Sequence, residues 1–120
     1  ARHGGGDGGH GRGGGGDGGG VGGGGGGGES GLLFDAGEGT LAMLRRRFGA
    51  AADEVVRALA LVWISHLHAD HHLGLVRLLE LRSARPGAAP LLVVGPHALG
   101  AWLREAAARL HSPVEFRFVH

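Results

Sequence analysis

Residues 61–72 read Leu-Val-Trp-Ile-Ser-His-Leu-His-Ala-Asp-His-His, so an apolar run gives way after Ser65 to a cluster of imidazoles with one carboxylate. The run 61–64 is mostly β-branched or aromatic, which predicts a strand that is covered on both faces. In extended backbone, residues two apart point to the same side. The spacing therefore predicts that His66 and His68 bind one metal ion.

The chain must turn after His68, so Asp70 and His71 are expected to face different directions and to suit a second ion beside the first. Imidazole nitrogen and carboxylate oxygen, without sulfur, form a ligand set that suits zinc, with manganese or iron as alternatives. Two ions about 3.5–4 Å apart can hold both the attacking and the leaving oxygen, and a bound metal lowers the pKa of water from about 16 to about 7. The motif therefore predicts hydrolysis by a metal-bound hydroxide.

The motif is short of ligands for a complete site. A catalytic zinc ion usually has three protein ligands and one open position, whereas this motif supplies two for each ion. His72 opens the next predicted helix, so we expect it at the helix start or behind the ligands and not among them. His97 at a helix start and His111 at a helix end are expected to be surface residues. We therefore expect the remaining ligands in sequence outside these 120 residues.

Apolar runs and helical spacings alternate along the rest of the chain, which predicts an α/β layered fold. Thr40 is the expected N-cap of the first helix, which Gly49 ends, and Pro96 is the expected first residue of the last helix. Four strands with buried faces cannot be enclosed by so few helices, so we expect an incomplete domain. The predicted strands are 32–34, 61–64, 91–94 and 114–120, and the predicted helices begin near residues 40, 53, 73 and 96.

The beginning of the chain has a different composition, because 20 of the 28 glycines lie within the first 28 positions. Glycine loses the most backbone entropy on folding and has no side chain to bury. We therefore expect residues 1–31 to form a disordered linker or insertion and residues 32–120 to form a partial domain. A single Arg-Gly-Gly triplet at Arg12 and a loose metal contact through His3 and His10 are weaker interpretations of this tract.

Composition excludes several classes of protein. The chain has no cysteine, so disulfide scaffolds and thiolate metal sites are excluded. Its longest apolar run, 58–64, is far shorter than the roughly 20 residues of a membrane-spanning helix, so no membrane segment is predicted. The net charge is +1, which neither favours nor excludes nucleic acid as a partner. The chain begins with Ala1, and we expect it to be a piece of a longer protein.

Residues 66–71 match His-x-His-x-Asp-His, and on this motif the chain resembles the metallo-β-lactamase superfamily. Residues 32–40, Leu-Leu-Phe-Asp-Ala-Gly-Glu-Gly-Thr, resemble the Leu-Leu-Asp-Cys-Gly-Glu-Gly-Thr segment of the tRNase Z family. Residues 64–75, and residues 91–96 together with 101–103, are similar to the carboxy-terminal half of the long form of that family. Ala36 replaces the usual cysteine, a change that we expect to be tolerated.

The resemblance implies an αββα sandwich, of which this chain holds roughly the first half, with two zinc ions at one edge. By the same resemblance, His66 and His68 would hold the first zinc ion, and Asp70 and His71 would hold the second. Asp70 would also be the catalytic general base, whereas Asp35 would support the active-site loops without binding metal.

The implied activity is that of an endoribonuclease that removes the 3′ trailer from precursor tRNA. The resemblance places it inside the cell, in the nucleus, the mitochondrion or another organelle, and leaves a homodimer open. The downstream histidine, aspartate and histidine ligands of the family are missing from this sequence, as are its Pro-x-Lys-x-Arg-Asn loop and its substrate-gripping arm.

Three alternatives remain. Residues 37–42 fit the dinucleotide fingerprint G-x-G-x-x-A, although Asp35 and Glu38 would repel a pyrophosphate. Another hydrolase of the superfamily, such as a thioesterase or lactamase, would share the metal motif but not the segment 35–40. The third alternative is a non-enzymatic one, an inactive fragment or an RNA-binding remnant, and it rests on the missing ligands.

Overall fold

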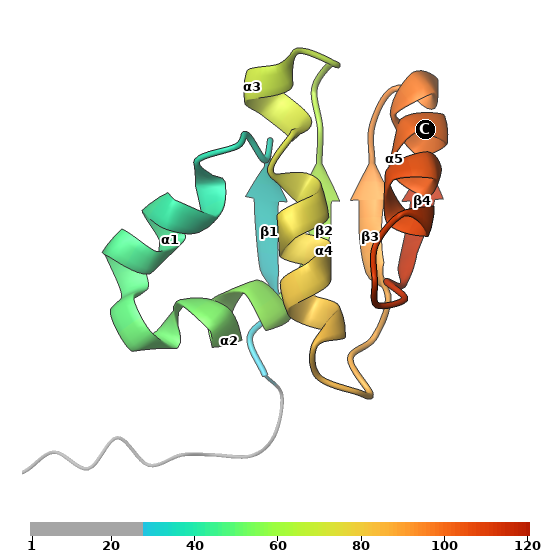
Figure 1. Cartoon of the computed structure of the whole chain (residues 1–120). Coiled ribbons are helices and arrows are strands. Elements are labelled where there is room, and N and C mark those ends of the chain that lie inside the picture. The colour runs from blue at the N-terminus through green and yellow to red at the C-terminus, as the bar shows by residue number, and fades with distance from the viewer. Residues whose placement is uncertain (1–27) are drawn as a thin grey trace, which may run out of the picture.

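Strands and helices alternate along the described part of the computed structural model, as the sequence predicts (Figure 1). The model describes residues 28–120, so the predictions for the glycine tract fall almost entirely outside the described residues. The elements are β1 (Gly31–Phe34), α1 (Thr40–Phe48), the 3-10 turn η1 (Gly49–Ala51), α2 (Ala52–Arg57), β2 (Leu59–Trp63), α3 (Ala69–His72), α4 (Leu75–Ser83), β3 (Leu91–Val94), α5 (His97–Ala108) and β4 (Phe116–Val119).

The four strands form one parallel sheet in the order β1-β2-β3-β4. Because parallel strands joined in this order by right-handed crossovers place every connecting helix on the same side, the helices gather on one face of the sheet (Figure 1). One row of neighbouring side chains points into that helical layer and is buried or half-buried. The row comprises Leu33, Val62, Val93 and Phe118.

The adjacent row points to the opposite face, which nothing covers within residues 28–120. Phe34 is 69% exposed there, and Trp63 and Val119 are 41% and 48% exposed. The prediction that both faces of the β2 strand are covered is therefore wrong for the described part of the chain, because all the crossovers lie on one side. One helical layer on one sheet is half of an αββα sandwich, which agrees with the prediction of a partial domain.

Helix boundaries differ from the sequence prediction by one or a few residues. Gly39 is the N-cap of α1 and Thr40 is its first residue, so the prediction of Thr40 as N-cap is wrong by one position. Pro96 is likewise the N-cap of α5 and not its first helical residue. Gly49 ends α1 as predicted, with a positive φ of 54° that glycine adopts without strain. The helix predicted from residue 73 begins at Leu75 as α4, and a separate helical turn that the sequence does not predict, α3, precedes it.

The core lies between the helices and the covered face of the sheet. Leu78 and Leu79 of α4 and Leu99 and Leu103 of α5 are fully buried or nearly so against that face. Each buried leucine contributes about 1.5–3 kcal/mol of transfer free energy, so this layer fixes the strands whose ends carry the polar motif. Among the described residues, no helix combines the length and the apolar character that crossing a bilayer requires.

Candidate metal centre

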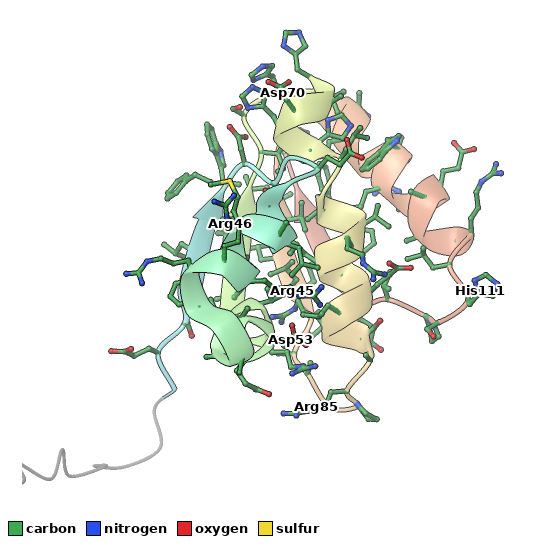
Figure 2. The ribbon with its side chains drawn as sticks, turned by 60° about the vertical axis from the view of Figure 1, so that its left-hand side comes forward. Arg45, Arg46, Asp53, Asp70, Arg85 and His111 are labelled. Carbon is green, nitrogen blue, oxygen red and sulfur yellow. The ribbon has the colours of Figure 1, made fainter. Side chains whose placement is uncertain are left out.

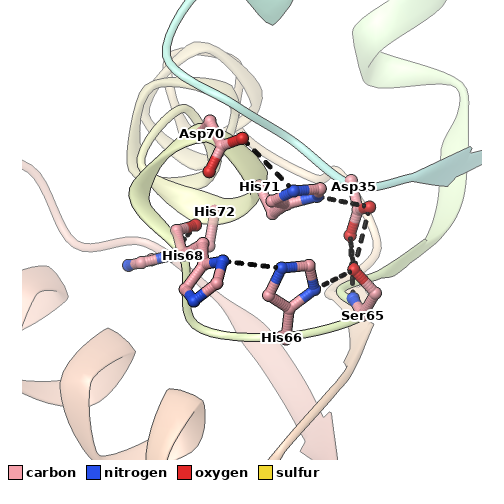
Figure 3. Close-up of polar contacts among 7 residues, drawn as sticks. All are labelled: Asp35, Ser65, His66, His68, Asp70, His71 and His72. Atoms are coloured by element: carbon pink, nitrogen blue, oxygen red, sulfur yellow. Dashed lines mark hydrogen bonds and ion pairs between the residues drawn. The ribbon is translucent and has the colours of Figure 1, made fainter.

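The histidine motif lies at the carboxyl edge of the sheet, where β1 and β2 end (Figures 1 and 3). Ser65, His66 and Leu67 form the connection after β2, and His68 is the extended N-cap of α3, with φ −78° and ψ 139°. Asp70 and His71 lie on the single turn of α3 itself. The loop that follows β1 passes beside this turn and brings Asp35 to it.

Asp35 is the polar centre of this edge. The backbone N–H of Ser65 donates to its Oδ1 (2.8 Å), the Ser65 hydroxyl lies 2.9 Å from both carboxylate oxygens, and His71 Nδ1 donates to Oδ2 (2.8 Å). Partial burial alone would raise the pKa of Asp35, but the hydrogen bonds from Ser65 and His71 outweigh it and hold that pKa below its ordinary value. The carboxylate is therefore ionised and fully engaged as an acceptor, which suits an orienting group and not a metal ligand.

His71 is oriented by that contact. Its hydrogen bond to Asp35 raises the pKa of His71 above the ordinary value, despite an opposing effect of burial, and the charge of Asp70 adds to the rise. With Nδ1–H donated to a carboxylate, Nε2 is the ring nitrogen left for a metal, the arrangement in which proteins commonly hold ligating histidines. Nε2 lies 3.3 Å from Oδ2 of Asp70. The two side chains therefore approach each other, although adjacent residues are expected to face different directions.

His66 and His68 form a second pair beside the first. His66 Nε2 and His68 Nδ1 are 3.0 Å apart, and the rings of His66 and His71 have centroids 4.1 Å apart. Because the Ser65 hydroxyl donates to Asp35, it accepts from His66 Nδ1–H (2.8 Å), and Nε2 of His66 is left without a proton. His66 Nε2 therefore accepts a hydrogen bond from His68 Nδ1–H, and a metal ion held between these two nitrogens would replace that proton (Figure 3).

The spacing of each pair suits one zinc ion. Two ligands held at about 2.0–2.1 Å on a tetrahedral ion lie roughly 3.3 Å apart, close to the 3.0 Å between the two nitrogens of the first pair and the 3.3 Å between the second pair's atoms. Within residues 28–120, no three histidine or acidic side chains converge on a single point. The described residues therefore bring the four predicted ligands together as two pairs, and the ligation of metal by each pair stays a prediction.

Backbone contacts that only glycine allows fix the turn that carries Asp70. A Cβ added to Gly37 would lie 2.1 Å from the carbonyl oxygen of Asp70, and one added to Gly74 would lie 2.0 Å from the carbonyl oxygen of Gly37. Ala36 N–H donates to the carbonyl of His71 (2.7 Å), and Gly74 N–H donates to the carbonyl of Ala36 (2.8 Å). The loop after β1 and the turn α3 are therefore held in one fixed arrangement by backbone contacts.

A hollow of about 610 Å³ opens beside Asp70, between the loop after β1 and the turn α3. The side chain of Asp70 is 79% exposed, so its carboxylate is accessible from solvent. Apolar and acidic side chains share the lining, among them Phe34, Glu38, Met43 and Leu73.

The described histidines outside the motif pairs agree with the sequence predictions except that His72 ends α3 and does not open α4. His97 and His111 are exposed, and His97 stacks edge-on against His120 at 5.2 Å between ring centroids. His72 is buried behind His68 and stays outside both ligand pairs. Sequence reasoning missed Ser65, because a serine after a strand gives no signal until the fold places it against Asp35, thirty positions earlier.

Sequence comparison identifies known proteins that are similar to this chain. The chain is 54% identical over 76 residues to the mitochondrial tRNase Z TRZ3 of Arabidopsis thaliana, and 46% identical over 82 residues to the human zinc phosphodiesterase ELAC protein 2. These stretches cover 60% and 64% of this chain, but the chain spans only 8% and 10% of those relatives.

Solved structures agree with the relatives. The crystal structure of a long form RNase Z from yeast superposes with a TM-score of 0.66 at 26% identity over 73% of this chain and 12% of that one. Human tRNase Z, short form, gives a TM-score of 0.59 at 30% identity over 73% of this chain and 31% of that one. Residues 31–119 match the family described as the beta-lactamase superfamily domain. Because that match takes in nearly all of the described residues, the chain belongs to the beta-lactamase superfamily domain family.

Proposed function

We propose that this chain carries the histidine-rich half of a zinc-dependent endoribonuclease that removes the 3′ trailer from precursor tRNA. The observation that carries the metal chemistry is the pair of adjacent two-ligand sets, His66 with His68 and Asp70 with His71, on one sheet edge. The assignment of tRNA as the substrate rests on the names of the relatives, tRNase Z and RNase Z, which share this region.

In this proposal His66 Nε2 and His68 Nδ1 hold the first zinc ion, and Asp70 and His71 Nε2 hold the second. Zinc held there lowers the pKa of a coordinated water and stabilises charge on a phosphoryl group. Asp35 keeps the His71 ring in place through Nδ1, and Ser65 does the same for His66. The third ligand of each ion comes from sequence beyond residues 28–120.

Asp70 is the proposed general base. One of its oxygens lies near His71, and its carboxylate is exposed toward the hollow beside α3, so the other oxygen can accept a proton from water. Asp35 is a poorer candidate because its oxygens already accept hydrogen bonds from Ser65 and His71. The hollow gives an RNA strand access to Asp70 from solvent.

The location and assembly of the protein are part of the proposal. Two Arabidopsis relatives are named as mitochondrial, which supports the mitochondrion as one site of action. A nuclear location and a homodimer stay predictions. Another hydrolase of the same superfamily is the second candidate, because the metal motif alone does not select a phosphodiester over a thioester.

The test uses His68→Ala in the natural full-length protein, with His111→Ala as the matched control. His111 lies well away from Asp70 (Figure 2), so the control changes an exposed histidine away from the site. We expect His68→Ala to abolish trailer removal and to lower the zinc content from two ions per chain, and His111→Ala to change neither. Trimming that persists in His68→Ala would contradict the ligand assignment, and cleavage of a thioester but not of precursor tRNA would favour the second candidate.

A further inference from the structure

His72 is a buried histidine that neither ligand pair uses. It is 7% exposed, and its Nδ1 lies 2.9 Å from the backbone carbonyl oxygen of His68. A carbonyl oxygen only accepts hydrogen bonds, so Nδ1 of His72 must carry the proton. The ring also packs edge-on against Trp102 of α5, with centroids 4.7 Å apart and planes at 89°.

We propose that His72 is a positioning residue for the first metal site, which acts by donating its Nδ1–H to the carbonyl of His68. The proposal rests on the zinc site proposed above and adds a role for a residue that does not itself bind metal. The direction of the His68 carbonyl sets the orientation of the His68 peptide and so of the imidazole attached to the same residue. His72 thereby holds Nδ1 of His68 opposite Nε2 of His66.

The short length of α3 explains why this contact matters. The helix has four residues, a single turn, and one isolated turn has too few hydrogen bonds to be stable alone. His68 is its N-cap, and no side chain caps it. The His68 carbonyl accepts from the backbone N–H of His71 (2.9 Å) as well as from the His72 ring, so two donors fix one carbonyl at the start of the turn.

The contact with Trp102 gives His72 a fixed support. Asp35, Ala36 and Gly74 tie the turn α3 to the loop after β1, whereas His72 ties it to α5 in the helical layer. The imidazole of His72 therefore packs against Trp102 and also donates a hydrogen bond to the His68 carbonyl. A purely apolar side chain would provide only the packing.

Three variants separate the hydrogen bond from the packing. His72→Asn places an amide N–H where Nδ1 stands and removes most of the ring from Trp102. His72→Leu keeps apolar volume against Trp102 and removes the donor. His72→Gln moves the amide farther out, toward the position of Nε2, and serves as the matched control for His72→Asn.

Zinc affinity of the natural full-length protein is measured by titration with the metal alone. The tautomer of His72 is measured by nitrogen NMR of the same protein without metal, at a pH where imidazole is neutral. We expect the proton on Nδ1 in the wild type and zinc affinity close to the wild type in His72→Asn. We expect zinc affinity to fall about 10- to 100-fold in His72→Leu and His72→Gln, the usual cost of losing a group that orients a ligand.

A proton on Nε2 would overturn the proposal, as would equal losses of affinity in His72→Asn and His72→Leu, because packing alone would then explain them. Unchanged affinity in all three variants would overturn it as well. Failure of the proposed function has a different signature: neither the wild type nor any variant binds zinc, although His72 still carries its proton on Nδ1.

Discussion

One charged side chain organises each edge of the sheet. At the amino edge, the guanidinium of Arg82 in α4 donates to the carbonyl oxygens of Val56 (3.0 Å), Arg57 and Ala89 (2.9 Å), and so joins the end of α2 to the segment before β3. At the carboxyl edge, the carboxylate of Asp35 accepts hydrogen bonds from Ser65 and His71.

The two edges differ in burial and in the kind of partner. Arg82 is 6% exposed, all its partners are backbone carbonyls, and burial lowers the pKa of its guanidinium. The side chain of Asp35 is 28% exposed, and one of its partners, His71, is a proposed metal ligand. A similar set of hydrogen bonds therefore stabilises the fold at one edge and orients a ligand at the other, so variants at the two edges should separate folding stability from metal binding.

The largest effect is expected at the amino edge, for Arg82→Met. Removing the buried guanidinium leaves its carbonyl partners without donors, which should lower the free energy of unfolding by about 3–5 kcal/mol. The matched control is Arg77→Met on the same helix, whose side chain is 67% exposed and which should change stability by less than about 0.5 kcal/mol. Denaturant unfolding of the full chain measures both, and zinc affinity of the folded protein should be unchanged in each. A loss of zinc affinity in folded Arg82→Met would break the distinction between the edges.

A smaller effect, a loss of zinc affinity, is expected at the carboxyl edge for Gly37→Ala. The new Cβ would meet the backbone of Asp70 at 2.1 Å, so the turn α3 must shift relative to Asp35. We expect zinc affinity to fall about tenfold or more, as for other changes that misplace a ligand.

Gly39→Ala is the control in the same loop, because a Cβ there meets nothing within 4 Å. Gly39 is the N-cap of α1, so this control should cost less than about 1 kcal/mol of stability and leave zinc affinity unchanged. Equal zinc affinities in the two variants would show that the loop can give way without moving the ligands.

Gly37 also shows how far sequence reasoning reaches. Residues 37–42 fit a dinucleotide fingerprint, in which glycine makes room for a pyrophosphate. In the structure, Gly37 makes room for the backbone of Asp70 instead, a contact between segments more than thirty residues apart. The local sequence pattern predicts that another group lies close to the backbone of Gly37. Only the fold shows that this group is the backbone of Asp70.

The same limit applies to the strands. The apolar runs at 61–64 and 91–94 correctly predict strands, because short apolar runs bounded by turn residues are typical of buried sheet. They do not indicate which face of the sheet is covered by helices of this chain. That depends on the sequence order of the strands in the sheet and on the side taken by each crossover, and Trp63 is exposed as a result.

The smallest effect, a pH dependence, tests the carboxyl edge without metal. The pKa of Asp35 lies below its ordinary value of 3.8, so the stability that the pair contributes is present above that pH and is lost as the pH falls through the folded-state pKa. The pKa of His71 lies above its ordinary value of 6.5, so its contribution is complete below that pH and is lost as the pH rises through the folded-state pKa. The pair should therefore stabilise the metal-free chain most between these two values.

Asp35→Asn removes both contributions, because the amide carries no charge to hold the proton on His71. The melting temperature of the wild type minus that of Asp35→Asn, measured in chelator across the pH range, should form a plateau between the two ordinary values and decline on either side. The plateau isolates the pair, since groups unaffected by the substitution cancel in the difference, among them Arg82 at the other edge. A difference that stayed level at alkaline pH instead of declining would mean that Asp35 stabilises the edge through Ser65 alone, and the orientation of His71 would then need another cause.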